Sequence, residues 1–173
     1  YYMREKGLES CLVKAVEMAI VLGVGYVKMS WNATSGDAYD VDPETGEFNY
    51  EGELEFSNPS FYDVIVDGTK ETWNNEWVMV RSFINRYNLI AKFPELEDEI
   101  MGLQTKDTLI NRSFSIWSND STDDVPVYEF FHKKTEALPE GRYIQFVSPE
   151  VILIDADMPY KEIPVFRVVP SEI

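Results

Sequence analysis

Near its start the chain has a clear helical pattern. Apolar residues recur every three or four positions between residues 8 and 22, and Glu9, Lys14 and Glu17 fall between them. The apolar positions are Leu8, Cys11, Leu12, Ala15, Val16, Ala19 and Leu22. This spacing predicts an amphipathic α-helix that buries these side chains, with Gly23 as its C-terminal stop.

Strict alternation of apolar and polar residues is clearest over residues 47–56. The apolar members are Phe48, Tyr50, Leu54 and Phe56. Glutamates occupy most of the positions between them, and Gly52 interrupts the apolar side. A period of two over ten residues predicts one half-buried strand with an acidic outer face. At Gly52 we expect a β-bulge.

Two short helices are predicted near the middle of the chain. Asn85 suits the N-cap of a helix that runs through Lys92. Pro94 ends that helix and can occupy the first turn of a second one, which Gly102 closes. Together these signals predict a short helical hairpin.

Strand patterns dominate the rest of the chain. They cover residues 25–31, 61–67, 76–83, 108–117, 125–134, 142–147, 151–155 and 163–169, with a turn at 138–141. The polar stretch 118–124 predicts a flexible loop. Because strands and helices do not alternate regularly, we expect an α+β fold with a mainly antiparallel sheet. The length of 173 residues fits a single domain, 1–173.

Charge narrows the classes of function. Thirty-one acidic and fifteen basic residues give a net charge of −16. Phosphate binding needs a basic face, so this balance argues against a general nucleic-acid binder and against anionic membrane surfaces. The lone Cys11 and the lone His132 exclude an intrachain disulfide and zinc sites built from several Cys or His. We expect no cofactor and no metal site.

Two motifs resemble ligand-binding loops in spacing but lack features that those loops need. Gly23-Val24-Gly25 follows a helix and precedes a strand, whereas a phosphate loop needs the reverse order. We therefore expect a helix stop and close backbone packing at these glycines. Four acidic residues have the spacing of the ligands in a calcium-binding loop: Asp40, Asp42, Glu44 and Glu51. Thr45 stands where that loop needs glycine, so we favour a hairpin turn formed by Pro43 and Gly46.

Aromatic and nucleophilic residues give no catalytic constellation. The tryptophans are Trp31, Trp73, Trp77 and Trp117. They could stack on sugar rings, but use in a core or an interface is the interpretation we favour. His132 has no Ser or Cys nucleophile nearby in the sequence, and Cys11 lies on the apolar helix face, so both are expected to be structural. We expect no catalytic residues.

Several weak motifs follow one another in a characteristic order. An opening helix leads into a Gly-x-Gly strand, and an aspartate-bearing strand and a Trp-containing strand follow. A Phe-Pro pair, a Val-x-Glu strand and a Pro-Tyr…Pro segment come after them. Their positions are Asp63, Asp67, Trp77, Arg81, Phe93, Pro94, Glu129, Gly141, Pro159, Tyr160 and Pro164. From about residue 8 to 169, the series resembles the portal proteins, or head-to-tail connectors, of short-tailed bacteriophages.

That resemblance implies a structural protein and no enzyme. Portals of this family form a twelve-membered ring at one capsid vertex, and DNA passes through it, driven by a separate terminase. The capsid protein and a tail adaptor are the other partners, the location is the virion, and assembly takes place in the host cytoplasm. The chain starts with Tyr1 instead of Met, which predicts an internal piece, the wing region, of a longer protein.

The acidic segment 37–56 has no match in the family pattern. Its carboxylates form our candidate partner surface, which comprises Glu47, Glu51, Glu53 and Glu55. Two other functions stay open. A carbohydrate-binding or glycosidase-like module would use the aromatic and acidic residues, and an acidic DNA mimic would need carboxylates at phosphate-like spacing.

Overall fold

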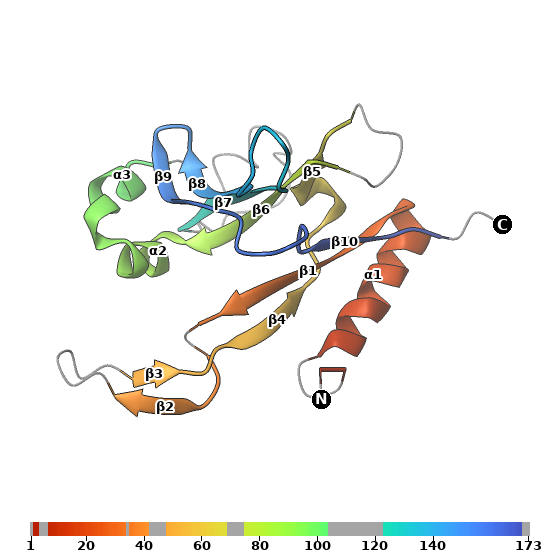
Figure 1. Ribbon diagram of the computed structural model, residues 1–173, viewed down its shortest axis with the longest axis horizontal. Helices are drawn as coiled ribbons and strands as arrows, with labels where there is room; N and C mark the ends of the chain where they lie inside the picture. Colours follow the sequence, from red (N-terminus) through yellow and green to blue (C-terminus); the bar gives the residue numbers. More distant parts are fainter. Residues whose placement is uncertain are drawn as a thin grey trace. The chain divides into compact units, whose positions relative to one another are not determined.

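The computed structural model describes residues 2–3, 7–33, 35–41, 48–68, 75–103 and 123–170 (Figure 1). It combines helices with mainly antiparallel sheets, which confirms the predicted α+β class. Contacts divide the chain into two compact units. Unit 1 comprises Tyr1–Phe61 and Pro164–Ile173, and unit 2 comprises Tyr62–Ile163. The single domain expected from chain length stays a prediction.

Unit 1 is built on a three-stranded antiparallel sheet in the order β10-β1-β4. The central strand β1 spans Gly25–Asn32 and pairs with β10, Val165–Val168, and with β4, Glu53–Ser57. Helix α1, Leu8–Leu22, packs against β1. The two edge strands therefore come from segments that are more than a hundred residues apart in the sequence.

Two glycines explain how α1 joins β1. Gly23 adopts a left-handed conformation with φ 82°, and its N–H donates to the Ala19 carbonyl, so it ends the helix as predicted. Gly25 lies against the helix backbone, because a Cβ at this residue would fall 1.9 Å from the Ala15 oxygen. The predicted helix stop and close backbone packing are both confirmed.

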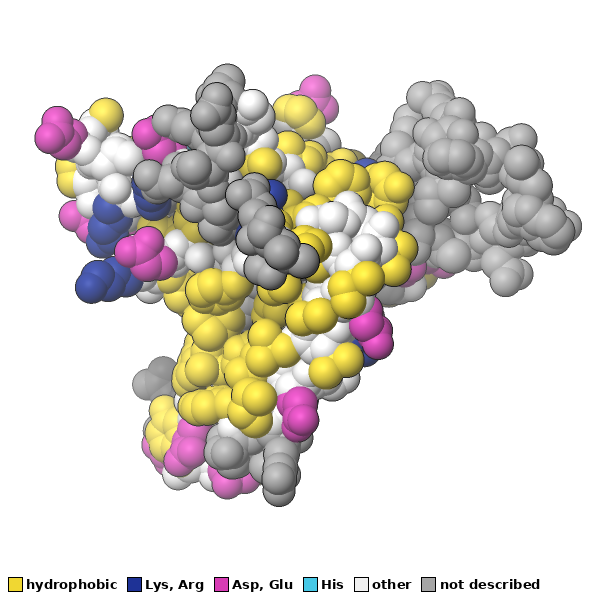
Figure 2. Space-filling view, turned by 90° about the vertical axis from the view of Figure 1, so that its right-hand side faces the viewer, with side chains coloured by type: hydrophobic (Ala, Val, Ile, Leu, Met, Phe, Trp, Pro, Cys, Tyr) yellow, Lys and Arg dark blue, Asp and Glu magenta, His cyan; other side chains and the backbone are white. Residues whose placement is uncertain are grey.

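The buried face of α1 is narrower than predicted. Only Ala15 and Ala19 are buried, whereas Leu12, Val16 and Leu22 are exposed. Because β1 approaches the helix backbone at Gly25, only small side chains fit between the two, and the larger ones lie outside the contact. Figure 2 shows the right-hand side of Figure 1, where hydrophobic side chains form a band with acidic side chains at its lower end.

The predicted strand 47–56 is wrong as a single element. It consists of β3, Phe48–Tyr50, which pairs with β2, Ala38–Val41, and of β4, which pairs with β1. Gly52 separates them with φ 77°, and a Cβ there would lie 2.4 Å from the Trp31 ring. Phe48 and Tyr50 are consequently exposed, not half-buried. The expected turn at 42–47 lies outside the described residues.

Unit 2 is a five-stranded antiparallel sheet in the order β5-β6-β7-β8-β9. Its strands are Val64–Val66, Trp77–Asn85, Asp124–His132, Arg142–Ser148 and Val151–Ala156. Most of the predicted strands are therefore confirmed. The first part of the expected strand 61–67 is instead a short 3₁₀ turn, η1, Phe61–Asp63. The expected strand 108–117 and most of the expected loop 118–124 lie outside the described residues, and Asp124 begins β7.

The predicted helical hairpin is confirmed at each of its signals. Helix α2, Arg86–Lys92, starts after Asn85, whose side chain accepts a hydrogen bond from the Tyr87 N–H at 3.0 Å. Pro94 opens the 3₁₀ turn η2, Pro94–Leu96, and helix α3, Glu97–Met101, ends at Gly102.

A compact apolar cluster forms the core of unit 2. Its buried members are Leu89, Ile100, Val125, Val127, Val147 and Val151. They come from both helices of the hairpin and from three strands, and Phe93 packs at their edge. The cluster therefore fixes the helical hairpin against the sheet.

Candidate functional site

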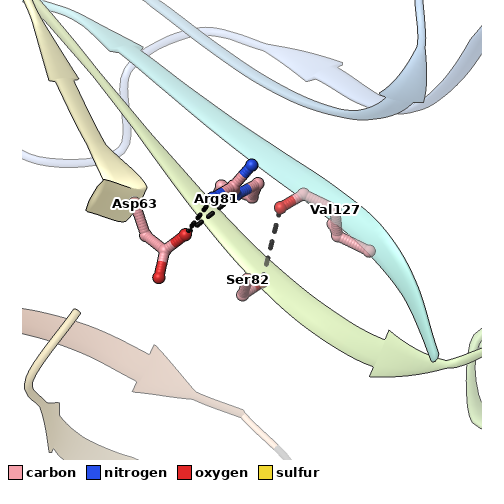
Figure 3. Close-up of polar contacts among 4 residues, drawn as sticks. All are labelled: Asp63, Arg81, Ser82 and Val127. Atoms are coloured by element: carbon pink, nitrogen blue, oxygen red, sulfur yellow. Dashed lines mark hydrogen bonds and ion pairs between the residues drawn. The ribbon is translucent and has the colours of Figure 1, made fainter. Parts of the chain in front are cut away.

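Two residues of the family pattern, Asp63 and Arg81, form an ion pair in unit 2. Arg81 donates from Nε at 2.8 Å and from Nη2 at 2.7 Å to the same oxygen, Asp63 Oδ1 (Figure 3). The side chains are 34% and 22% exposed, so water screens the pair only in part. The contact ties η1, just before β5, to the middle of β6, and the Arg81 guanidinium also lies 5.4 Å from the centre of the Phe83 ring.

A neighbouring contact holds the next strand pair. Ser82 Oγ donates to the Val127 carbonyl at 3.4 Å, from β6 to β7 (Figure 3). Ser82 and Arg81 are adjacent, so their side chains project from opposite faces of the strand. Side chains of one short segment of β6 therefore contact η1 and β7.

Aromatic contacts involve two further positions of the family pattern. Trp77 stacks on Phe130 with ring centres 5.9 Å apart. The Tyr143 hydroxyl donates to Glu129 Oε1 at 3.2 Å. Burial first, and then the negative charge and hydrogen bond of Glu129, raise the pKa of Tyr143 above its ordinary value. Glu129 is thus held inside the sheet by a neutral hydrogen-bond donor.

Gly141 occupies a position that no other residue fits easily. Its φ is 66°, and a Cβ would lie 2.7 Å from the Met158 Cβ and 2.8 Å from the His132 carbonyl oxygen. The Gly141 N–H donates to Leu138, which closes the predicted turn. Only glycine adopts this conformation readily while leaving room for Met158.

The remaining positions of the family pattern are spread over both units. Phe93 and Pro94 lie at the junction of α2 and η2. Asp67 follows β5. Pro164 is buried in unit 1, and its carbonyl accepts a hydrogen bond from the Met29 N–H at 2.9 Å. Pro159 is exposed and Tyr160 is half-buried. Within unit 2, the residues of the family pattern lie in separate elements and make separate contacts.

Groups that could perform chemistry are sparse in the described part of the chain. No set of three or more His, Cys, Asp or Glu side chains there could hold a metal ion. His132 Nδ1 lies 2.8 Å from the Lys133 carbonyl, and its ring packs near Phe130. Cys11 is half-buried on α1, with Sγ 3.6 Å from the Phe56 carbonyl. Both residues are in structural settings.

The candidate partner surface keeps part of its predicted form. Glu53 and Glu55 lie on one face of β4, where Glu53 accepts from Ser35 Oγ at 3.2 Å and Glu55 from Asn32 Nδ2 at 2.7 Å. Glu51 is exposed beside Gly52. Glu47 lies outside the described residues. The acidic face is therefore present on β4, but it does not continue as one strand.

Sequence reasoning missed a hollow at this surface. It has a volume of about 320 Å³, and its lining includes Trp31, Asp37, Glu51 and Glu53. These residues come from β1, from the start of the hairpin and from the segment around Gly52. Alternation within β4 predicted Glu53, but nothing in the sequence indicates that the Trp31 ring lies over Gly52 and walls the hollow.

Unit 2 contains a second hollow, which is apolar. Its volume is about 480 Å³, and Met79, Tyr128 and Phe146 form its sheet side. Tyr128 and Phe146 stack on each other with ring centres 5.2 Å apart. Among the described residues that line this hollow, none has a charged side chain.

Comparison with protein-family models and with curated proteins finds no match for this chain. Among the described helices, none has both the length and the apolar character needed to cross a membrane.

Proposed function

We propose that this chain is the wing region of a bacteriophage portal subunit, a structural part of the ring through which the genome is packaged and ejected. The observation that carries the proposal is the Asp63–Arg81 pair. The resemblance selects these two residues from separate segments, and they meet through two contacts shorter than 3 Å. Such a meeting is what a shared structural framework predicts, and it supports the proposal.

The character of the other selected residues also supports a structural role. Trp77 stacks on Phe130, and Phe93 packs against the core of unit 2. Glu129 binds Tyr143, and Gly141 allows the close approach of Met158. Each of these contacts stabilises a strand, a turn or the helical hairpin. Residues with such contacts fit an assembly scaffold better than a catalytic centre.

The charge of the chain suits a conduit for DNA. Each phosphate that a basic residue neutralises adds affinity and would slow the passage of DNA. A net charge of −16 keeps such contacts few. Under this proposal the partners are other copies of the subunit in a twelve-membered ring, the capsid protein, the terminase and a tail adaptor. The protein would be located in the virion after assembly in the host cytoplasm, and it would need no cofactor.

The test is negative-stain electron microscopy of the full-length gene product that contains this chain. We expect rings with a central hole. Small discrete particles at every protein and salt concentration would overturn the proposal. A variant with Asp63→Asn and Arg81→Met, compared with the exposed pair variant Arg142→Gln and Asp155→Asn, tests the framework directly. We expect fewer complete rings only for the first.

The acidic surface has its own test within this proposal. Charge reversal at Glu51, Glu53 and Glu55 should weaken assembly with the capsid or with a neighbouring subunit, because like charges would then face a basic partner. Reversal of the exposed Glu136 and Glu150 in unit 2 serves as the control. Unchanged assembly of the triple variant would remove this surface from the proposal.

A second candidate function, carbohydrate binding, has one observation in its favour. The hollow in unit 1 combines a half-exposed indole, Trp31, with the carboxylates of Asp37, Glu51 and Glu53. An aromatic platform with polar groups beside it is a common way to hold a sugar ring. Tryptophan fluorescence during a glycan titration, with Trp31→Ala as the control, tests this function. A fluorescence change that Trp31→Ala abolishes would support it, and no change would reject it.

A further inference from the structure

The hairpin of β2 and β3 has no interior. All residues of both strands are exposed, from Ala38 to Val41 and from Phe48 to Tyr50. In Figure 1 the hairpin extends beyond the ends of β1 and β4 within unit 1. A two-stranded hairpin alone is marginally stable in water. Its side chains are thus available for a contact outside the chain.

One face of this hairpin is apolar. Val41 pairs with Phe48, so both side chains share a face, and Tyr50 shares it by the period of two. Phe48 is 59% exposed, Val41 44% and Tyr50 39%. Tyr39, at the irregularity of the pairing, is 66% exposed. The opposite face carries the polar pair Asp40 and Asn49.

The segment that carries this apolar face is acidic in sequence, and so are the described residues at the base of the hairpin. Residues 37–56 contain eight Asp or Glu and no Lys or Arg. At the base of the hairpin, the Glu51 N–H donates to the Asp37 carbonyl at 3.1 Å, which places these two acidic residues side by side. Both line the hollow next to Trp31. An apolar face with an acidic border is complementary to an apolar patch with a basic border.

We propose that the apolar face of the β2–β3 hairpin docks on a partner protein that presents aliphatic side chains bordered by Arg and Lys. A second copy of this chain is a poor occupant, because two acidic borders would repel each other. The proposal does not depend on the portal assignment, since segment 37–56 has no counterpart in the portal pattern. It adds the chemistry of a partner to strands β2 and β3, for which the proposed function gives no role.

The test uses the whole chain and a fluorescently labelled peptide that alternates Arg and Val, followed by fluorescence anisotropy. Two control peptides alternate Arg with Ser and Glu with Val. We expect the Arg-Val peptide to bind roughly tenfold more tightly than either control, because both apolar contact and opposite charge contribute. Its affinity should fall as salt is raised. Equal binding of either control peptide would overturn the proposal.

Variants locate the binding on the hairpin. Phe48→Ser with Tyr50→Ser, and separately Asp37→Asn with Glu51→Gln, should each weaken binding of the Arg-Val peptide by roughly tenfold. The matched controls in unit 2 are Tyr87→Ser with Ile152→Ser and Glu136→Gln with Glu150→Gln, which should change nothing. If both hairpin variants bind like the unchanged chain, the proposal fails.

Two further measurements close the remaining outcomes. Sedimentation analysis compares the unchanged chain with Phe48→Ser, and we expect both to be monomeric. If the unchanged chain self-associates and Phe48→Ser does not, the hairpin binds a second copy of this chain and the proposal is overturned. Circular dichroism checks that the hairpin variants fold, which we expect because their side chains are exposed. If a variant does not fold, the binding of the three peptides to the unchanged chain still tests the proposal.

Discussion

The backbone of Gly25 lies against the backbone carbonyl of Ala15, so a methyl group at residue 25 would fall 1.9 Å from that oxygen. No side-chain rotation can relieve the clash, because the backbone fixes the position of the Cβ and the Ala15 oxygen is a main-chain atom. Helix α1 and strand β1 must then separate. We expect Gly25→Ala to lower the free energy of unfolding by about 2 kcal/mol. Urea denaturation measures this, and Gly68→Ala, which has open space around it, should change little.

The Asp63–Arg81 pair should show energetic coupling in a double-mutant cycle. We expect about 1 kcal/mol between Asp63→Asn and Arg81→Met, since the pair is only partly exposed and two donors share one oxygen. The Arg142–Asp155 pair has similar distances but lies at the surface, so its coupling should be smaller. Equal coupling in both pairs would contradict the role assigned to burial.

Tyr143 should make the protein less stable in alkaline solution. Its folded pKa is raised by burial, then by Glu129, so the folded chain holds this proton more tightly than the unfolded chain. The contribution of Tyr143 to the free energy of unfolding is therefore fully present below about pH 10, the ordinary tyrosine pKa, and is lost as the pH rises above it. Denaturation at increasing pH measures the loss. Tyr143→Phe should reduce the slope and cost about 1 kcal/mol near neutrality, through its lost hydrogen bond.

Tyrosinate absorbance provides an independent check on the same group. In an alkaline titration, Tyr143 and Tyr26 should ionise after the exposed tyrosines, because burial raises the pKa of both. Arg167 offsets part of the effect at Tyr26. Removal of either side chain by substitution with Phe should shorten the late part of the curve. If Tyr143→Phe instead removed absorbance from the early part of the curve and left the late part unchanged, the raised pKa of Tyr143 would be contradicted.

As the N-cap of α2, Asn85 should contribute about 1 kcal/mol to the free energy of unfolding. Its side chain accepts from the Tyr87 N–H, and Asn85→Ala leaves that donor without the side-chain acceptor. Asn85→Asp keeps the acceptor and should retain stability. Thermal unfolding followed by circular dichroism compares the three proteins. Equal melting temperatures for Asn85→Ala and the unchanged chain would contradict the capping role.

Local signals predicted the parts of the fold that local chemistry determines. Asn85, Pro94 and Gly23 each mark a helix boundary through their own backbone or side-chain preference, and the structure places the boundaries there. The buried face of α1 was predicted too wide because the width depends on how closely β1 approaches. That distance is fixed by Gly25, outside the helix.

Long-range contacts account for what could not be predicted. Alternation runs through residues 47–56, yet the Trp31 ring occupies the space beside Gly52 and the strand divides there. The resemblance selected Asp63 and Arg81 individually, but nothing in their spacing indicates that they pair. The hollow in unit 1 draws its lining from three separate segments, so no sequence window contains it.

The sheet of unit 1 takes β1 and β4 from one part of the chain and β10 from residues that follow the whole of unit 2. On the ribosome, β1 therefore emerges with one edge open, and it keeps that edge until the complete second unit has been synthesised. Unit 2 is contiguous and can fold while unit 1 waits for its last strand. The order of synthesis thus completes unit 1 only after unit 2, although the helix and first strands of unit 1 are made earlier.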